Sequence, residues 1–376
     1  MTDLVLGEES KQYQDLAKDF FQNEVAVKSE SLDHSGVFPA DLYKAAWELG
    51  LASTFIPEAC GGLGLSLWDS AVMAEEAGAA SGGVAAIFEA NALACAPVLL
   101  AGSDAQKEKF LSKVAGEAAL AGFCFPGLSD SAAPAAQVKV SSKGSSYTIN
   151  APLLIAVNGE NAAWYFVLAQ NDDGTESAFV FPSDLPGVIR GAQISKLGRK
   201  CADISQVELR NLELGAEHLL GKAGKGRDVA NEAACISATI VAAHATGLMR
   251  CGLEHSIRYS KERETFGKPI GKHQAVGFIL ADMAKSVECA RLMTWKAADL
   301  FDKSVRDHMQ ALCAKVFAVD AAMAAATDAV QVYGGYGYSK EYPVERLMRD
   351  AKMMQMMAGS SFELKCSIGE EQLSKS

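Results

Sequence analysis

Two short motifs in the last third of the chain carry side chains that could bind a phosphate-bearing ligand. The first is RETF, at residues 263–266, and a KHQA segment with His273 and Gln274 follows it. The second is QVYGG, at residues 331–335. An arginine such as Arg263 can grip a phosphate through two parallel hydrogen bonds, and glycines let the backbone approach a ligand closely. The alternative interpretation is structural: the arginine ends a helix and the glycines form a turn.

The charge and the cysteine pattern exclude several other kinds of site. The net charge of −11 argues against a nucleic-acid-binding surface. The nine cysteines show no CxxC or Cys/His ligand spacing, which predicts reduced thiols and neither a metal site nor a disulfide framework. We expect no signal peptide and, without an unbroken apolar run of about 18 residues, no membrane span. A cytoplasmic protein is therefore expected.

The elements that position these motifs fall into three parts. Residues 1–118 place apolar side chains at helical spacing and predict an N-terminal α-helical domain. Residues 119–222 contain short β-rich segments broken by turn residues, which predict a small β-sandwich or barrel. Residues 223–376 contain four long helical segments, the last at 343–371, and predict a four-helix bundle. The sequence thus predicts an α+β multi-domain protein with both motifs in the bundle.

This order of domains, together with several motifs, resembles the acyl-CoA dehydrogenase family, close to its medium- and short-chain members. The motifs are IPEACGGLGL, the pair Glu75–Glu76, AGSDAQKEKFL, RETFGKPIGKHQA and QVYGGYGYSKEYPVERLMRDAK. The resemblance covers essentially the whole chain. It implies a three-part fold that is usually tetrameric. It also implies FAD-dependent removal of two hydrogens from Cα and Cβ of an acyl-CoA thioester, with electrons passing to an electron-transfer flavoprotein.

The same resemblance indicates that the catalytic base is absent. Members carry a Glu before the Gly that follows the RDAK segment, and the matching residue here is Ala358, in MMQMMAGSSF. Some relatives carry the base on the first long C-terminal helix, where this chain has Ser237. Neither residue can serve as the carboxylate that removes the α-proton. Glu363 and Glu232 lie five residues from these positions, about 140° around a helix, so we interpret both as surface acids.

The residues that would face the chain's own flavin and substrate are also changed. The loop that carries Thr and Gly-Ser-Asp in the family reads FCFPGLSDSAAPAA, with Pro126 at the Thr position. The Trp-Ile-Thr segment that stacks on the flavin matches residues 155–157, which read Ile-Ala-Val, and a basic residue that helps hold CoA matches Ala238. We interpret the methionines of MMQMMAGSSF as residues that fill the vacated pocket.

The residues that a family member lends to its neighbour's FAD are kept. By resemblance they are Arg263, Thr265, Phe266, His273, Gln274, Gln331, Gly334 and Gly335. The residues that would face the chain's own flavin are lost, whereas the residues that would contact a neighbour's FAD are kept. This combination predicts a non-catalytic subunit of a heterotetrameric acyl-CoA dehydrogenase. This chain would complete the FAD site of a homologous catalytic subunit and be inactive alone. The expected partners are that subunit, acyl-CoA through the complex and an electron-transfer flavoprotein.

Three other functions stay open. A homo-oligomeric flavin dehydrogenase could use a relocated base, an acyl-CoA-binding homo-oligomer could perform non-redox chemistry, and an assembly protein could have lost every site. Bleaching of bound flavin by acyl-CoA would indicate the first function. Bound CoA without flavin would indicate the second, and absence of both ligands the third.

Overall fold

The structure is a computed structural model that describes residues 5–126, 138–357 and 359–375. Its N-terminal part is helical, with α1 (Glu8–Phe20), α2 (Ser29–Ser35), α3 (Ala40–Glu48), α4 (Leu67–Ala80), α5 (Gly82–Ala101) and α6 (Asp104–Gly116). Helix α5 is apolar around most of its circumference, apart from the buried Glu89 and Asn91, and is buried along most of its length. The core of this part is built around Phe21, Tyr43 and Phe88.

The described residues of the middle part form eight strands: β1 (Leu120–Pro126), β2 (Lys139–Lys143), β3 (Ser146–Val157), β4 (Ala162–Gln170), β5 (Glu176–Pro182), β6 (Val188–Gln193), β7 (Ile204–Leu214) and β8 (Leu219–Leu220). They pair into one sheet in the order β6-β7-β3-β1-β4-β5-β8, and β2 pairs with β3 and β4. One face packs on α5 and α6 through Trp164 and Phe110. The other face encloses a core of residues from the strands and their connecting segments, such as Tyr147 and Phe179.

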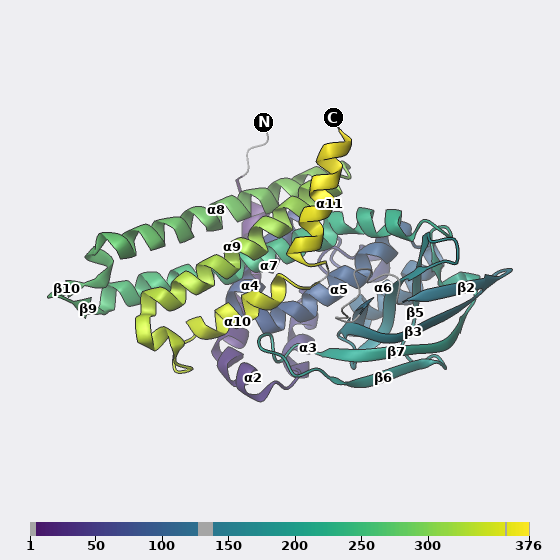
Figure 1. Cartoon of the computed structure of the whole chain (residues 1–376), viewed down its shortest axis with the longest axis horizontal. Coiled ribbons are helices and arrows are strands. Elements are labelled where there is room, and N and C mark those ends of the chain that lie inside the picture. Colours follow the sequence, from purple (N-terminus) through teal and green to yellow (C-terminus); the bar gives the residue numbers. More distant parts are fainter. Residues whose placement is uncertain (1–4, 127–137, 358, 376) are drawn as a thin grey trace.

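The C-terminal part is a helical bundle: α7 (Gly226–Glu262), α8 (Gln274–Asp302), α9 (His308–Tyr333), α10 (Val344–Met354) and α11 (Ser361–Ser374), with a small hairpin of β9 (Glu264–Thr265) and β10 (Lys268–Pro269). Helices α7, α8 and α9 run side by side, and the hairpin lies at one end of them (Figure 1). Helices, then a sheet, then a bundle confirm the predicted fold class.

The last predicted long helix, at 343–371, is wrong in one respect, because the chain forms two helices there. Helix α10 ends at Met354 and α11 begins at Ser361. Between them Gly359 has a φ of 89°, a left-handed conformation that stops a helix. Ser360 then caps α11 in a capping box with Glu363.

Among the described residues, three helical segments are long and apolar enough on average to cross a membrane: Gly82–Ala101, Gly226–Glu262 and His308–Tyr338. Within the protein, 83 % and 89 % of the most apolar window is buried in the first two. In His308–Tyr338 the buried share of that window is 56 %.

Candidate cofactor site

An open groove of about 460 Å³ lies at the hairpin end of the bundle. The end of α7, the β9–β10 hairpin and the end of α9 form its walls. Four residues that the sequence predicted line it together: Arg263, Thr265, Gly334 and Gly335. The structure therefore joins the RETF and QVYGG motifs in one site. The lining also includes residues that were not predicted, namely Tyr259, Ile270, Val332, Tyr333 and Tyr336.

The hairpin beside the groove holds an aromatic ring in solvent. Phe266 and Gly267 form its turn with φ angles of 52° and 77°, as a two-residue type I′ turn requires. A positive φ is unfavourable for a residue as bulky as Phe, yet Phe266 is 96 % exposed. Thr265 Oγ1 lies 3.2 Å from His273 Nε2, in a hydrogen bond that ties the hairpin to the start of α8. The Phe266 ring meets the His273 ring edge-on, with ring centres 6.1 Å apart, and otherwise stays in solvent.

Bare backbone forms part of the groove wall at the end of α9. Gly334 adopts φ 60° and ψ −137°, a conformation that is essentially restricted to glycine. A Cβ on either Gly334 or Gly335 would meet no other atom within 4 Å. Backbone geometry, and not crowding within the chain, therefore requires glycine at position 334.

Substituting these two glycines by alanine separates the two effects. Gly334→Ala is expected to destabilise the protein by about 1–3 kcal/mol, because alanine is strained at this φ and ψ. Gly335→Ala is the matched control and should change stability by less than about 0.5 kcal/mol. Urea unfolding followed by circular dichroism measures both. Equal losses in the two variants would contradict the conformational argument.

Arg263 supplies positive charge to the groove. Its side chain is exposed and its guanidinium lies 5.8 Å from the ring centre of Tyr336. The ion pairs found among the described residues leave Arg263 without a carboxylate partner. An arginine without a carboxylate partner, beside accessible glycine backbone, is suited to an anionic ligand such as a phosphate.

A cluster of tyrosines fixes the two helix ends that form the groove. Tyr259 of α7 and Tyr333 of α9 stack with ring centres 4.0 Å apart. Tyr342 contacts the edges of both rings, at 6.3 and 5.5 Å, and the Tyr333 hydroxyl donates a hydrogen bond to the His255 carbonyl. The ends of α7 and α9 are therefore held together without any ligand.

The remaining predicted cofactor residues surround the groove without lining it. Phe266 is at the tip of the hairpin and His273 is hydrogen-bonded to its base. Gln274 begins α8, and Gln331 lies in the last turn of α9; both side chains are exposed.

A second region contains the residues that, by resemblance, would face the chain's own flavin. Val157 and Met357 are buried there, and Phe125, Ile155 and Met353 pack against them partly buried. We call these five residues the apolar plug. They offer no side-chain hydrogen-bonding group apart from weakly accepting thioethers, so a polar ring system would lose its water without gaining strong partners. Of the four methionines in MMQMMAGSSF, Met353 and Met357 pack in this plug, whereas Met354 packs in the core of the bundle and Met356 is 47 % exposed.

The predicted base positions have no free carboxylate in the part of the chain that the structure describes. Ala358 lies outside the described residues, as does the loop 127–137 that follows Pro126. Ser237 donates a hydrogen bond to the Ala233 carbonyl one turn earlier in α7. Glu363 accepts the Ser360 N–H at 2.8 Å in the capping box. Glu232 lies 3.7 Å from Arg306 at the surface.

A buried lysine holds the segment on both sides of Ala358. Lys315 of α9 is 2 % exposed, and its Nζ donates hydrogen bonds to the carbonyls of Met357 and Gly359, at 3.0 and 3.3 Å. Burial lowers the pKa of Lys315 to about 8. The segment that carries a base in the family is thus fixed here by its backbone carbonyls.

A buried ion cluster joins the three parts of the chain. Arg199, before β7, donates two hydrogen bonds of 2.6 and 2.8 Å to Glu89 of α5, and His244 Nδ1 lies 3.2 Å from the same carboxylate. Burial alone would raise the pKa of Glu89, but Arg199 and His244 outweigh it and hold that pKa at about 2. Asp350 of α10 accepts a hydrogen bond from the Arg199 backbone N–H.

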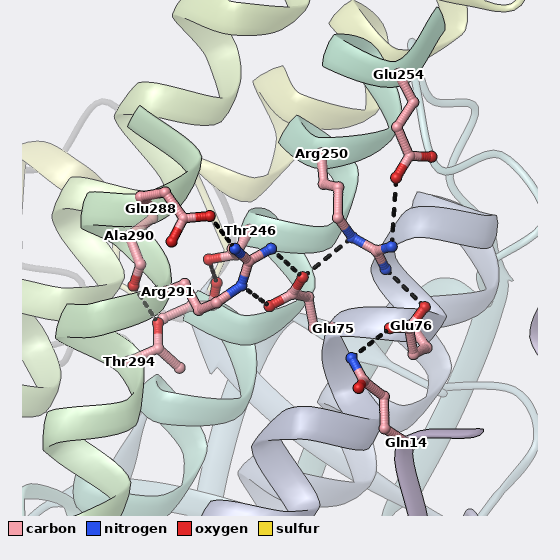
Figure 2. A network of polar contacts seen from close by, with 11 residues as sticks. Gln14, Glu75, Glu76, Thr246, Arg250, Glu254, Glu288, Ala290, Arg291 and Thr294 are labelled. Carbon is pink, nitrogen blue, oxygen red and sulfur yellow. Dashed lines mark hydrogen bonds and ion pairs between the residues drawn. The ribbon is translucent and has the colours of Figure 1, made fainter. Parts of the chain in front are cut away.

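A second network connects α4 to α7 and α8 (Figure 2). Glu75 accepts hydrogen bonds of 3.0 and 2.8 Å from Arg291 and pairs with Arg250 at 3.0 Å. Glu76 accepts hydrogen bonds from Arg250 and from Gln14, at 2.6 and 3.0 Å. Both glutamates are at most 5 % exposed. The Glu75–Glu76 pair therefore connects the N-terminal part to the bundle through ion pairs and hydrogen bonds, which is a structural role.

Comparison with known proteins finds relatives along most of the chain. A family model described as "Acyl-CoA dehydrogenase, N-terminal domain" matches residues 7–118, and one described as "Acyl-CoA dehydrogenase, C-terminal domain" matches residues 224–373. An acyl-CoA dehydrogenase of Bacillus subtilis (strain 168) is 35 % identical over 352 residues, which cover 92 % of this chain and 93 % of the relative.

Solved structures show the same architecture. Butyryl-CoA dehydrogenase from Megasphaera elsdenii superposes with a TM-score of 0.92 and 32 % identity, covering 99 % of this chain and 100 % of that one. An acyl-CoA dehydrogenase from Bacillus anthracis, complexed with FAD, superposes with a TM-score of 0.90 and 27 % identity. That match covers 100 % of this chain and 68 % of the other.

Proposed function

The chain belongs to the acyl-CoA dehydrogenase family, and we propose that in this family it is a non-catalytic subunit that completes the FAD site of a catalytic partner. FAD, when bound, supplies the hydride acceptor for α,β-dehydrogenation of an acyl-CoA thioester. In this proposal Arg263, Gly334 and Gly335 hold the phosphate-bearing part of the cofactor. The partner supplies the carboxylate base and the surface on which the flavin ring lies.

The contrast between the groove and the apolar plug is the observation that carries this proposal. The groove offers what a pyrophosphate needs, an unpaired arginine and accessible backbone. The plug offers apolar side chains where the chain's own flavin ring would require hydrogen-bond partners. The residues of this chain therefore fit the phosphate-bearing part of FAD but not its flavin ring. This is expected of a chain that supplies only part of a shared FAD site.

The polar side chains at and near the predicted base positions already have bonding partners within the chain, and this supports the non-catalytic role. Ser237 and Glu363 satisfy local backbone groups, and Glu232 pairs with an arginine at the surface. This disfavours the alternative in which a relocated base makes the chain a complete flavin dehydrogenase. In the proposed complex, located in the cytoplasm, an electron-transfer flavoprotein would accept the electrons from the partner's flavin.

Flavin content tests the proposal directly. We expect the chain purified alone to show no flavin spectrum and no acyl-CoA dehydrogenase activity. Co-expression with a homologous chain that carries the Glu and the Trp-Ile-Thr segment should give a yellow complex with about one FAD per pair of chains. The homologous chain alone is the control and should bind FAD more weakly. One tightly bound FAD per chain in the isolated protein, bleached by an acyl-CoA, would overturn the proposal.

A further inference from the structure

A cavity of about 40 Å³ lies where the N-terminal part meets the bundle. Helices α4, α5 and α7 contact one another near the middle of the molecule (Figure 1) and supply most of its wall. Phe21 and the segment at 51–55 complete the wall, and every lining residue except Phe55 is buried. No described residue lines both this cavity and the groove, or both this cavity and the apolar plug. The cavity is therefore separate from the cofactor site.

The wall of the cavity is mostly apolar, but it includes a buried hydroxyl without a partner. Four of the lining residues are alanines, at positions 52, 74, 77 and 92, and such small side chains leave space that larger ones would fill. Ser70 of α4 also lines the cavity and is 2 % exposed. Its Oγ has no hydrogen-bond partner within the described residues. A buried hydroxyl of this kind costs free energy, which a ligand that bonds to Ser70 would recover.

His244 of α7 brings a second hydrogen-bonding atom to the cavity. Its side chain lines the cavity and is 1 % exposed. Nδ1 lies 3.2 Å from the Glu89 carboxylate, and Nε2 has no hydrogen bond to any described residue. Because Arg199 keeps Glu89 ionised, the carboxylate only accepts hydrogen bonds, so Nδ1 carries the ring proton. Nε2 of the neutral ring is therefore an acceptor that requires a donor.

The polar amide in the wall is already satisfied. Asn91 Nδ2 donates to the Tyr43 hydroxyl at 3.0 Å, and Asn91 Oδ1 accepts the Ala121 N–H at 2.9 Å. Among the described residues, no lysine or arginine lines the cavity. An anionic ligand would therefore lose its hydration without gaining a counter-charge. A neutral ligand with one hydroxyl group fits the available partners, Ser70 and His244.

The volume limits the ligand to a few non-hydrogen atoms. One water needs about 10–15 Å³ of such space, so the cavity of about 40 Å³ accommodates about three or four atoms of that size. Ethanol and 2-propanol are molecules of this size. Each has a hydroxyl that can donate to His244 Nε2 and an alkyl part that suits the alanines.

We propose that this cavity binds one small hydroxylic molecule of the size of ethanol or 2-propanol, whose hydroxyl donates to His244 Nε2 and accepts from Ser70 Oγ. The bound molecule contacts α4, α5 and α7 together, beside the buried ion cluster. Binding therefore stabilises the contact between the N-terminal part and the bundle. A ligand of so few atoms makes few contacts, so the expected Kd is on the order of 1 mM. The site needs no partner subunit and does not depend on the proposed function.

A pair of molecules of the same shape tests the site on the isolated chain. Ligand-observed NMR at pH 8 should show 2-propanol binding with a Kd on the order of 1 mM. Acetone has the same shape but no hydroxyl, so it leaves Nε2 without a donor and should bind at least about tenfold more weakly. The longer 1-hexanol exceeds the volume of the cavity and should not bind. Displacement of 2-propanol by ethanol would place both alcohols in one site.

Three variants locate the bound alcohol. Ser70→Ala removes one hydrogen bond and should raise the Kd for 2-propanol at least about fivefold. Ala92→Leu fills the cavity and should abolish binding. The matched control is Ser256→Ala, because Ser256 is also a buried helical serine but bonds to the Gly252 carbonyl and lies outside the cavity. The control should bind 2-propanol like the wild type, and circular dichroism should show all three variants folded.

The same measurements can overturn the site. Equal affinity for 2-propanol and acetone would remove the role of His244, and an unchanged Kd in Ser70→Ala would remove that of Ser70. Undiminished binding to a folded Ala92→Leu variant would place the alcohol elsewhere. Long-lived water signals near His244 that no alcohol displaces would make the cavity a water site only. Each of these four results overturns the proposal, and none of them affects the proposed FAD site.

Discussion

Replacing Arg263 by alanine is expected to lower the FAD affinity of the proposed two-subunit complex by about 10- to 100-fold, which is the range of hydrogen bonds to a charged group. Arg263 contributes an unpaired positive charge to the groove, so its loss removes attraction without leaving a buried partner behind. Assembly should be unchanged. Equilibrium dialysis, or titration of the flavin spectrum against the purified apo-complex, measures the affinity.

Two further variants show whether charge alone or the guanidinium geometry matters. Arg263→Lys keeps the charge but cannot form two parallel hydrogen bonds, so it should recover only part of the affinity. Lys268→Ala, in the same hairpin but outside the lining of the groove, should bind FAD like the wild type. Full affinity in Arg263→Ala would mean that the groove does not contact the cofactor.

The second large effect is expected at the buried ion cluster. Glu89→Gln leaves the Arg199 guanidinium, which has no exposed surface, without a compensating charge. Breaking a buried pair in this way destabilises a protein by about 3–5 kcal/mol. Thermal and urea unfolding measure the loss. A Glu89→Met, Arg199→Met double variant should lose less than the single variant, since no charge is then left unpaired. Wild-type stability in Glu89→Gln would show that the pair contributes nothing net.

The same cluster predicts a dependence of stability on pH. The pKa of Glu89 is about 2 in the folded protein against an ordinary value of 4.5. A carboxylate whose pKa is depressed by folding stabilises the protein fully above the unfolded pKa, and this contribution is lost as pH falls toward the folded pKa. The stability difference between wild type and Glu89→Gln should therefore shrink between about pH 4.5 and pH 2. A difference that stays constant over this range would contradict the shifted pKa.

The fold was largely predictable because its signals are local. Helical spacing of apolar residues and the β-rich, turn-broken middle segment each extend over short windows. The helix predicted at 343–371 was wrong because apolar and methionine residues continue through the break. A signal was present all the same, since Ser360 and Glu363 form the S-x-x-E pattern of a capping box.

The groove was predictable only in part. Resemblance indicated that Arg263 and Gly334 act together, although about 70 residues separate them. Tyr259 and Val332 were not predicted, because a residue on an apolar helix face has the same spacing whether it packs in a core or lines a groove. The contact between Glu89, Arg199 and His244 left no local pattern at all, because it joins segments that only the tertiary fold brings together.

Helix α7 has a mechanical consequence. It runs without a break from Gly226 to Glu262, about 56 Å at the rise of an α-helix. His244, in its middle, is bonded into the ion cluster, and Arg263 follows its last residue. The groove therefore lies at the end of one continuous helix, and the middle of that helix is bonded to the ion cluster. The distance between the ion cluster and the groove is therefore set by the length of α7. In the proposed complex, the partner subunit would have to match that distance.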